Sequence, residues 1–371
     1  MKKILMLLNG LLLFSCSNGQ NKIADNGLRS SDIQLSEKQT QLIYDKTKSF
    51  PENTEISIAI INNEQINFVG IKRQNDTIIQ TKNHKSIFEI GSISKVFTST
   101  LLSNSVTNGQ IKLEDNIQDY IDYKLNTTES IKFLELANHT SGLPRLPSSL
   151  NLMLSDPNNP YKNYDEEKLK IYLTEKLKLN QLPSEKYEYS NLGAGFLGYL
   201  LGEISNSSYE KMLQDMIFSK YGMSYSTTER TNLKGKLIKG LNDKGKETSN
   251  WDLNILSGAG GILSSVEDMS KFALAQFNDA NSELALTHKP TFKINENMDI
   301  GLGWHIIKAS DGKNEVIWHN GGTGGYTSSM ALDLKNNYGI IILSNVSAFN
   351  KSMSEIDNLC FGLMKTMWGE K

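Results

Sequence analysis

Strand-like sequence patterns occur near both ends of the 371-residue chain, with a long stretch of other patterns between them. Apolar residues alternate over 56–60 and 66–70, and strand patterns return over 315–318, 328–334 and 339–343. A period of two places successive side chains on opposite faces of a sheet. Two strand regions early and three late therefore predict one antiparallel sheet assembled from both chain ends.

Helical patterns occupy the middle of the chain. Segments 166–179 and 192–204 have helical periodicity and are separated by loops rich in Pro, Asn and Ser. We therefore predict an α/β fold of the α+β type. An antiparallel sheet flanked by helices, from about 36–115 and 250–371, would carry an all-α part from about 116–249.

Three further helices are expected around the strands. Ser36 followed by Gln39 is a capping-box pattern that begins a first helix. A broadly apolar helix is expected over 92–106, where Asn108 and Gly109 follow as a stop. The last amphipathic helix is expected near 353–368.

The N-terminus has the pattern of a signal peptide, predicted to be residues 1–15. Lys2 and Lys3 precede an apolar stretch over 4–14, which at about 11 residues is too short for a hydrocarbon core of about 30 Å. The polar stretch that follows has no apolar period and predicts a flexible tether over 16–35.

The end of this leader resembles a second known signal. Leu13-Phe14-Ser15-Cys16 resembles the lipobox of bacterial lipoproteins, in which the cysteine carries the lipid. The resemblance implies an exported bacterial lipoprotein of the cell envelope, attached to a membrane through Cys16. The other cysteine is Cys360, so lipid on Cys16 would leave no pair for a disulfide.

Charge and motif content exclude several classes of partner. Lys and Arg total 39 and Asp and Glu total 41, so no basic surface for nucleic acid is expected. The five histidines form no metal-binding helical pair, and no phosphate loop or dinucleotide fingerprint occurs. We therefore expect a monomer without metal or cofactor that acts on a small molecule or peptide.

Ser92-Ile93-Ser94-Lys95 begins the predicted buried helix and is the first candidate site. A separation of three residues places Ser92 and Lys95 on one helical face, where a desolvated lysine can take the proton of a serine nucleophile. A serine that only caps the helix is the alternative. The tetrad Ser310-Asp311-Gly312-Lys313 has the same spacing, but Asp-Gly predicts a turn there.

Tyr189-Ser190-Asn191, before a glycine-containing helix, is the second candidate. A tyrosine near a cation can act as a base, and the amide of Asn191 both donates and accepts hydrogen bonds. Tyr161-Lys162-Asn163 has the same pattern. It is expected in an irregular, exposed loop, so the later copy is preferred.

His319-Asn320-Gly321-Gly322 ends a predicted strand and is the third candidate. Glycines let a ligand lie against the backbone, and a backbone N–H here could form an oxyanion hole with that of Ser92. The alternative for His319 is a strand-end histidine that packs on Trp318.

Together and in this order, residues 88–95, 189–191 and 319–321 resemble the three motifs of class C β-lactamases and related penicillin-binding serine hydrolases. Segments 139–144 and 301–304 add to the resemblance, as does the sequence GGILSSVEDM that begins at Gly260. It spans about Ser36 to Trp368 and implies one hydrolase domain over 36–371. The active site would lie between a sheet domain and an all-helical domain, with Ser92, Lys95 and Tyr189 as catalytic residues.

Two departures from that family concern the substrate. Typical class C enzymes have Lys-Thr-Gly where this chain has His319-Asn320-Gly321, and a glutamine near the position of Arg145-Leu146. Loss of the lysine weakens recognition of a β-lactam carboxylate unless His319 is protonated or Arg145 substitutes. His-x-Gly occurs instead among family DD-peptidases, D-amino-acid-specific peptidases and esterases.

The resulting functional hypothesis is acyl transfer to water. Ser92 would attack a carbonyl, Lys95 and Tyr189 would move its proton, and Asn191 would orient the acyl chain. The substrate would be an amide such as a β-lactam or a D-alanyl peptide. The alternatives are an esterase of the same fold and a non-catalytic sensor of cell-wall peptides or penicillin.

Overall fold

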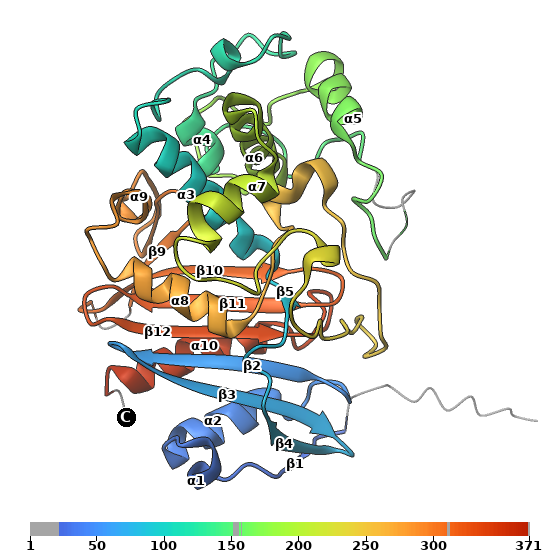
Figure 1. Ribbon diagram of the computed structural model, residues 1–371, viewed down its shortest axis with the longest axis vertical. Coiled ribbons are helices and arrows are strands. Elements are labelled where there is room, and N and C mark those ends of the chain that lie inside the picture. Colours follow the sequence, from blue (N-terminus) through green and yellow to red (C-terminus); the bar gives the residue numbers. More distant parts are fainter. Residues whose placement is uncertain (1–21, 151–155, 157, 310–311, 370–371) are drawn as a thin grey trace, which may run out of the picture.

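The structure is a computed structural model that describes residues 22–150, 156, 158–309 and 312–369. Its centre is a ten-stranded sheet, drawn in the lower half of Figure 1. In spatial order the strands are β1 (Asp25–Asn26), β4 (Thr77–Thr81), β3 (Gln65–Gln74), β2 (Glu55–Asn62), β12 (Tyr338–Ser344), β11 (Thr327–Asp333), β10 (Glu315–Gly322), β9 (His305–Lys308), β8 (Met298–Ile300) and β7 (Phe292–Asn295).

The predicted assembly of the sheet from both chain ends is confirmed. Strand β2 pairs antiparallel with β12, so that Ile58 lies opposite Ile342. All other neighbouring pairs are antiparallel as well, except β1 with β4. The sheet is larger than predicted because short strands such as β7, whose residues alternate between half-buried and exposed, bury too little apolar surface to give a clear pattern.

Helices cover both faces of the sheet, as predicted for this fold class. Helices α2 (Glu37–Thr47) and α10 (Ser354–Met367) pack together on one face, and α8 (Val266–Gln276) lies against β2 and β12 on the other (Figure 1). The predicted capping box is present at the start of α2, where Ser36 and Gln39 satisfy each other's backbone N–H groups.

Most of the helical part lies at one end of the sheet, in the upper half of Figure 1, but Leu237 and Leu241 near its end form bridges with Ile87 and Val346. Between 116 and 249 the described residues contain no strand of either sheet. Their elements are η2 (Ile117–Tyr120), α4 (Phe133–Ala137), α5 (Glu166–Ile171), η3 (Tyr172–Lys176), α6 (Asn191–Ser205), α7 (Tyr209–Leu213), η4 (Gln214–Phe218) and η5 (Arg230–Asn232). The helix predicted over 166–179 is shorter than expected. Helix α5 continues directly into the π-helical turn η3, which ends at Lys176.

Helix α3 (Ser94–Thr107) joins the two parts of the molecule. It contacts α4 and α6 of the helical part and also α9 (Ser282–Ala285). Phe97 stacks on Phe272 of α8 with ring centroids 4.2 Å apart and meets the edge of Phe218. The turn η1 (Gly91–Ile93) precedes α3 and follows β5 (Phe88–Glu89), which pairs with β6 (Leu263–Ser264).

A flexible tether was expected over 16–35, but residues 22–35, which the structure describes, are packed against the rest of the fold. Residues 25–26 form β1, and α1 (Ser30–Ile33) follows. Ala24, Leu28 and Ile33 are buried in the core between the sheet and α2. Their irregular spacing matches neither the helical nor the strand period, which is why the sequence shows no sign of this packing. The predicted signal peptide and Cys16 lie outside the described residues.

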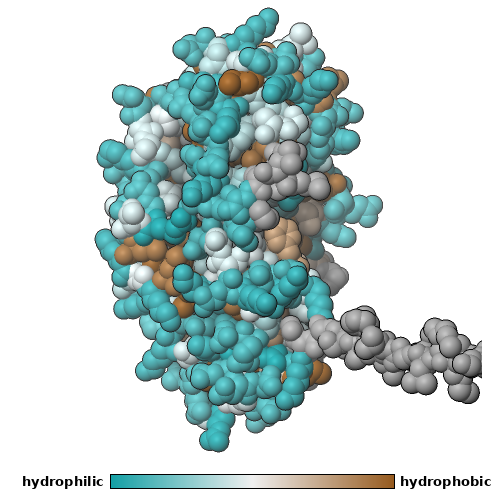
Figure 2. Space-filling model, turned by 90° about the vertical axis from the view of Figure 1, so that its right-hand side faces the viewer, coloured by the Kyte–Doolittle hydropathy of each residue, from teal (hydrophilic) through white to brown (hydrophobic). Residues whose placement is uncertain are grey.

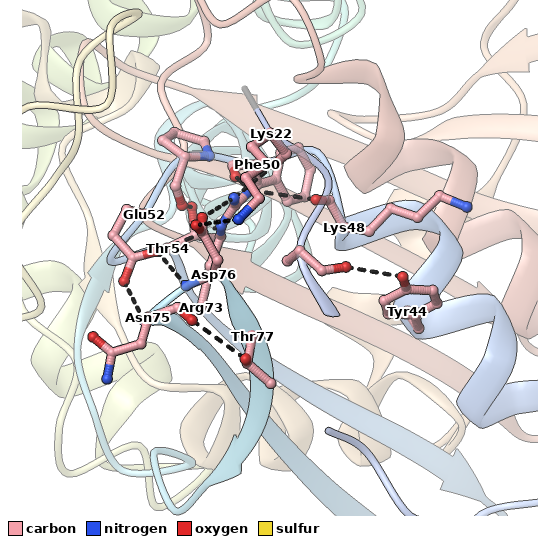
Figure 3. Close-up of polar contacts among 12 residues, drawn as sticks. Lys22, Tyr44, Lys48, Phe50, Glu52, Thr54, Arg73, Asn75, Asp76 and Thr77 are labelled. Atoms are coloured by element: carbon pink, nitrogen blue, oxygen red, sulfur yellow. Dashed lines mark hydrogen bonds and ion pairs between the residues drawn. The ribbon is translucent and has the colours of Figure 1, made fainter. Parts of the chain in front are cut away.

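Arg73 of β3 holds this N-terminal segment in place (Figure 3). Its side chain is 3% exposed and donates hydrogen bonds to the carbonyl oxygens of Lys22 (2.6 Å), Phe50 and Lys48 (3.3 Å). It also binds the Asp76 carboxylate at 2.8 Å. One buried guanidinium thus satisfies backbone acceptors from two separate segments of the chain.

The surface drawn in Figure 2 is mostly polar, with apolar side chains in small separate groups. Within the described ranges, no helix is long and apolar enough to span a bilayer.

Arg73→Met tests how much the hydrogen bonds of the buried Arg73 side chain contribute to stability. Loss of the guanidinium leaves buried carbonyl oxygens without donors, so the free energy of unfolding should fall by about 2–4 kcal/mol. Lys72→Met on the same strand, which removes a partly exposed ion pair with Glu55, should change it by less than about 0.5 kcal/mol. Urea unfolding measures both, and equal losses in the two variants would contradict this role for Arg73.

Candidate active site

Ser92 lies in the turn η1, between the short strand β5 and the buried helix α3. Gly91 before it has a φ of +51°, a left-handed conformation that favours glycine. A Cβ on Gly91 would also lie 2.6 Å from the backbone nitrogen of Gly322. The turn therefore packs directly against the end of β10, and glycine is required for this approach.

Two more contacts fix the turn against the sheet. Ser328 of β11 donates a hydrogen bond from Oγ to the carbonyl oxygen of Ile90, at 2.8 Å. Gly321 of β10 approaches the same carbonyl so closely that a Cβ there would lie 2.0 Å from the oxygen. The sheet thus sets the position of the serine turn through backbone contacts.

Lys95 lies one helical turn after Ser92 and is 2% exposed. Its Nζ is 3.0 Å from Ser92 Oγ, 2.8 Å from Asn191 Oδ1 and 2.6 Å from the carbonyl oxygen of Ala259. No carboxylate forms an ion pair with it in the part of the chain that the structure describes. Burial, and secondarily the charge of Arg145, hold the pKa of Lys95 well below its ordinary value.

The start of α6 brings Tyr189 and Asn191 to Lys95. Ser190 caps this helix, because its Oγ accepts a hydrogen bond from the N–H of Gly193 at 2.8 Å. The same hydroxyl donates to the carbonyl oxygen of Pro144 at 2.7 Å. The structure therefore brings together four residues predicted from sequence, Ser92, Lys95, Tyr189 and Asn191.

Tyr189 lies between basic groups and aromatic rings. Lys95 Nζ is 4.8 Å from its ring centroid, Arg145 Cζ is 5.1 Å away, and the His139 ring is 4.5 Å away. Burial raises the pKa of Tyr189 well above its ordinary value, against the opposing effects of a hydrogen bond with Ser92 and the charge of Arg145. The phenol therefore carries its proton at neutral pH.

The end of β10 presents a backbone donor to the serine turn. The N–H of Thr323 donates to the carbonyl oxygen of Tyr326 at 2.9 Å, which makes Gly322 and Thr327 a non-hydrogen-bonded pair of the ladder. In such a pair the N–H groups point away from the partner strand. The N–H of Gly322 is therefore not used by β11, and its nitrogen would lie 2.6 Å from a Cβ on Gly91, in the turn that holds Ser92.

His319 is enclosed and neutral. Its side chain is 1% exposed, and Nδ1 donates to the carbonyl oxygen of Asn320 at 2.6 Å, so the other ring nitrogen carries no proton in the neutral ring. Burial, with the neighbouring His305 and Lys95, holds the pKa of His319 well below its ordinary value. The packing on Trp318 that was the alternative for His319 is made by the His305 ring, 5.5 Å from Trp318 and 5.3 Å from His319.

His139 was not among the predicted site residues, although its segment carried the family resemblance. It has a φ of +62°, and its Nδ1 accepts a hydrogen bond from the N–H of Ser190 at 3.2 Å. Tyr187, which packs edge-on against this ring, is hydrogen-bonded to His305 at 2.9 Å. His139 thus contacts Tyr189 directly, and Tyr187 links the His139 ring to His305.

Tyr161 was expected in an exposed loop, and this prediction is wrong. The side chain is 5% exposed and packs against Trp251 with ring centroids 5.5 Å apart. Its aromatic ring gains from burial although the backbone around it is irregular. The tyrosine beside Ser92 is nevertheless Tyr189, as preferred from the sequence. Ser310 of the second Ser-x-x-Lys tetrad lies outside the described residues.

No group of three or more His, Cys, Asp or Glu side chains is placed to hold a metal ion within the described portion. The arrangement instead suits nucleophilic chemistry: a serine next to a buried amine, a phenol, and backbone donors at the end of a strand.

The sequence matches a known family over most of its length. A family model described as Beta-lactamase covers residues 56–359. A beta-lactamase of Pseudomonas fluorescens is 25% identical over 259 residues, 68% of this chain and 69% of that protein. The Protein flp of Staphylococcus aureus strain MW2 is 22% identical over 275 residues, 70% of this chain and 53% of that protein. The chain thus spans about half the length of the staphylococcal relative.

Solved structures share the fold. An octameric penicillin-binding protein homologue from Pyrococcus abyssi superposes with a TM-score of 0.75 at 22% identity, over 90% of this chain and 77% of that one. A beta-lactamase/D-alanine carboxypeptidase from Pseudomonas syringae gives 0.71 at 20% identity, over 88% and 98%. A class C beta lactamase from Rhodobacter sphaeroides gives 0.73 at 17% identity, over 90% and 100%. The resemblance seen in the sequence motifs is therefore confirmed at the level of family and fold.

Ser328→Ala tests whether the sheet positions the serine turn. Without the hydrogen bond to Ile90, an activated serine probe should label the protein about tenfold more slowly, because the turn loses its alignment. Ser329→Ala removes a comparably buried hydroxyl that binds Trp318 Nε1 at 3.1 Å. It should leave the labelling rate within about twofold, although each variant should lose about 1 kcal/mol of stability. Equal labelling rates in the two variants would contradict the positioning role.

Proposed function

The chain belongs to the beta-lactamase family, and from this premise we propose that it is a serine hydrolase that works through an acyl-enzyme on Ser92. The observation that carries the proposal is the contact of Ser92 Oγ with the buried Nζ of Lys95, at 3.0 Å. A serine hydroxyl is a weak nucleophile until a neighbouring base takes its proton.

The hydrogen bonds of Lys95 favour its role as that base. A neutral amine has two protons and one lone pair. Two carbonyl acceptors, Asn191 Oδ1 at 2.8 Å and the Ala259 oxygen at 2.6 Å, can take both protons. The lone pair then faces Ser92 Oγ. Because the pKa of Lys95 is lowered, this neutral amine is populated at a lower pH than in an ordinary lysine.

Tyr189 would act as the proton donor to the leaving group. Burial keeps its phenol protonated, and the effect of Ser92 on the pKa of Tyr189 supports an interaction between the phenol and the reacting hydroxyl. Ser92 would attack the carbonyl as Lys95 takes its proton. The tetrahedral intermediate would then collapse as Tyr189 gives its proton to the leaving group and recovers one from Lys95. A water molecule would hydrolyse the acyl-enzyme by the reverse proton path.

The remaining predicted residues would bind the substrate. The N–H groups of Ser92 and Gly322 would hold the oxyanion, and close packing at Gly321 keeps the two segments together. Asn191 would orient the acyl chain while its Oδ1 holds Lys95. His319 would shape the wall of the site as a neutral group rather than bind a carboxylate.

The substrate we propose is an amide such as a β-lactam or a D-alanyl peptide, in line with the names of the relatives. An esterase of the same fold is the second candidate, favoured by the absence of charge on His319, where a β-lactam carboxylate would need a cation. Turnover of nitrocefin, p-nitrophenyl acetate and a D-Ala-D-Ala peptide by one preparation distinguishes them. Acylation without release over hours would instead support a sensor.

Ser92→Ala tests the nucleophile. The variant should lose covalent labelling by a fluorescent penicillin or an activated serine probe, and hydrolysis should fall at least about 10³-fold, because no acyl-enzyme can form. Ser310→Ala in the second Ser-x-x-Lys tetrad is the matched control and should label as the wild type does. Labelling that persists in Ser92→Ala, measured by intact mass, would contradict the assignment.

A further inference from the structure

Arg145 lies beside the reactive groups, and its backbone is tied to the start of α6. Its carbonyl oxygen accepts hydrogen bonds from the N–H groups of Asn191 and Leu192, at 3.0 and 3.2 Å. These bonds cap the helix that carries Asn191 and fix the position from which the Arg145 side chain extends.

The side chain of Arg145 is exposed, and its guanidinium lies over the ring of Tyr189, with Cζ 5.1 Å from the centroid. Its charge also contributes to the lowered pKa values of Lys95 and His139 and opposes the rise in the pKa of Tyr161 that burial causes. A guanidinium stacked on an aromatic face keeps its N–H donors available at the edge of its plane.

The guanidinium forms no ion pair within the described ranges of the chain, unlike Arg73 with Asp76 and Arg230 with Asp252. The two basic residues of the predicted motifs, Lys95 and His319, cannot serve as anion ligands in its place. Lys95 is buried and held by Asn191 and Ala259, and His319 is enclosed and hydrogen-bonded to its own backbone. Arg145 therefore supplies an exposed and permanent positive charge over the ring of Tyr189.

We propose that Arg145 binds an anionic group, a carboxylate by its planar geometry, carried by the acyl part of the substrate. This inference rests on the proposed function, in which Asn191 orients the acyl chain. The Arg145 carbonyl accepts a hydrogen bond from the N–H of Asn191, so the residue that carries the guanidinium adjoins the residue proposed to orient the acyl chain. The paired N–H donors of arginine match the two oxygens of a carboxylate. The substrate class is thus a hydrolysable ester or amide whose acyl group bears a free carboxylate.

Two esters with one leaving group test this inference. p-Nitrophenyl hexanoate is neutral, and the mono-p-nitrophenyl ester of adipic acid has the same chain length with a carboxylate at its end. The wild type should acylate faster with the adipate ester, as measured by the first equivalent of p-nitrophenolate released. Arg145→Gln should lose about 10- to 100-fold on that ester and less than about threefold on hexanoate. Arg145→Lys should recover part of the loss.

Lys162→Gln is the matched control, because Lys162 is an exposed cation next to Tyr161 and the substitution removes the same charge. Both esters should react with this variant within about threefold of the wild type. A loss as large as that of Arg145→Gln would show that only the general positive charge matters and would overturn the proposal.

The outcomes separate this inference from the proposed function. Equal losses on both esters in Arg145→Gln mean that Arg145 acts through Tyr189, which overturns the anion site while Ser92 chemistry stands. No effect on either ester, or failure of the adipate ester to acylate an enzyme that a serine probe labels, also overturns it. If no probe labels Ser92 and neither ester reacts, the proposed function fails, and the inference that rests on it fails too.

Discussion

The site depends on the burial of one amine. Lys95 is enclosed without a carboxylate partner in the described structure, and three oxygen atoms surround its Nζ. Burying an unpaired ammonium ion costs far more than burying a neutral amine, so the fold itself favours the deprotonated form. The oxygens come from Ser92, Asn191 and Ala259, which lie far apart in the sequence. The fold must therefore bring three segments together before a reactive serine exists.

Polar residues of α3 help to hold the segment of Ala259 against Lys95. Ser94 accepts a hydrogen bond from the N–H of Ile262 at 3.1 Å, and Thr98 donates to the carbonyl oxygen of Gly258 at 2.7 Å. Gly258 and Ile262 both belong to the segment that contains Ala259. Buried hydroxyls along one helix thus fix the backbone oxygen that holds Lys95, while Phe97 on another face packs into the core. The polar contacts give position, and the apolar contacts give stability.

Much of the fold could be predicted because its central strands and motif residues have strong local signals. The alternation over 56–60 and the strand pattern over 339–343 indicated β2 and β12, and Ser36 with Gln39 indicated the start of α2. Burial could not be predicted where the backbone is irregular. Ala24 and Leu28 pack into the core without any period, and Tyr161 is buried in a segment without a helix or strand. Tertiary packing decides such positions.

In the candidate site too, local sequence signals predicted some features, and others depend on the folded surroundings. The spacing of Ser92 and Lys95, and the order of the motifs, indicated which residues meet. The protonation state of His319 could not follow from sequence, because it depends on enclosure by His305 and on a bond to its own backbone. The role of Arg145 likewise depends on what surrounds its guanidinium. The charge of each group at the site thus depends on the folded environment. The sequence could therefore predict the catalytic residues but not the charges that select the substrate.

The most direct test of the central claim is a titration of Lys95 itself. NMR of protein labelled with ¹³C at lysine Cε, with a Lys95→Met variant to assign the signal, measures its pKa. The account predicts a transition well below the ordinary value of 10.5, because burial and Arg145 both disfavour the ammonium form. A Lys95 signal that titrates at or above 10.5 would contradict the account, since the amine could not then take the proton of Ser92.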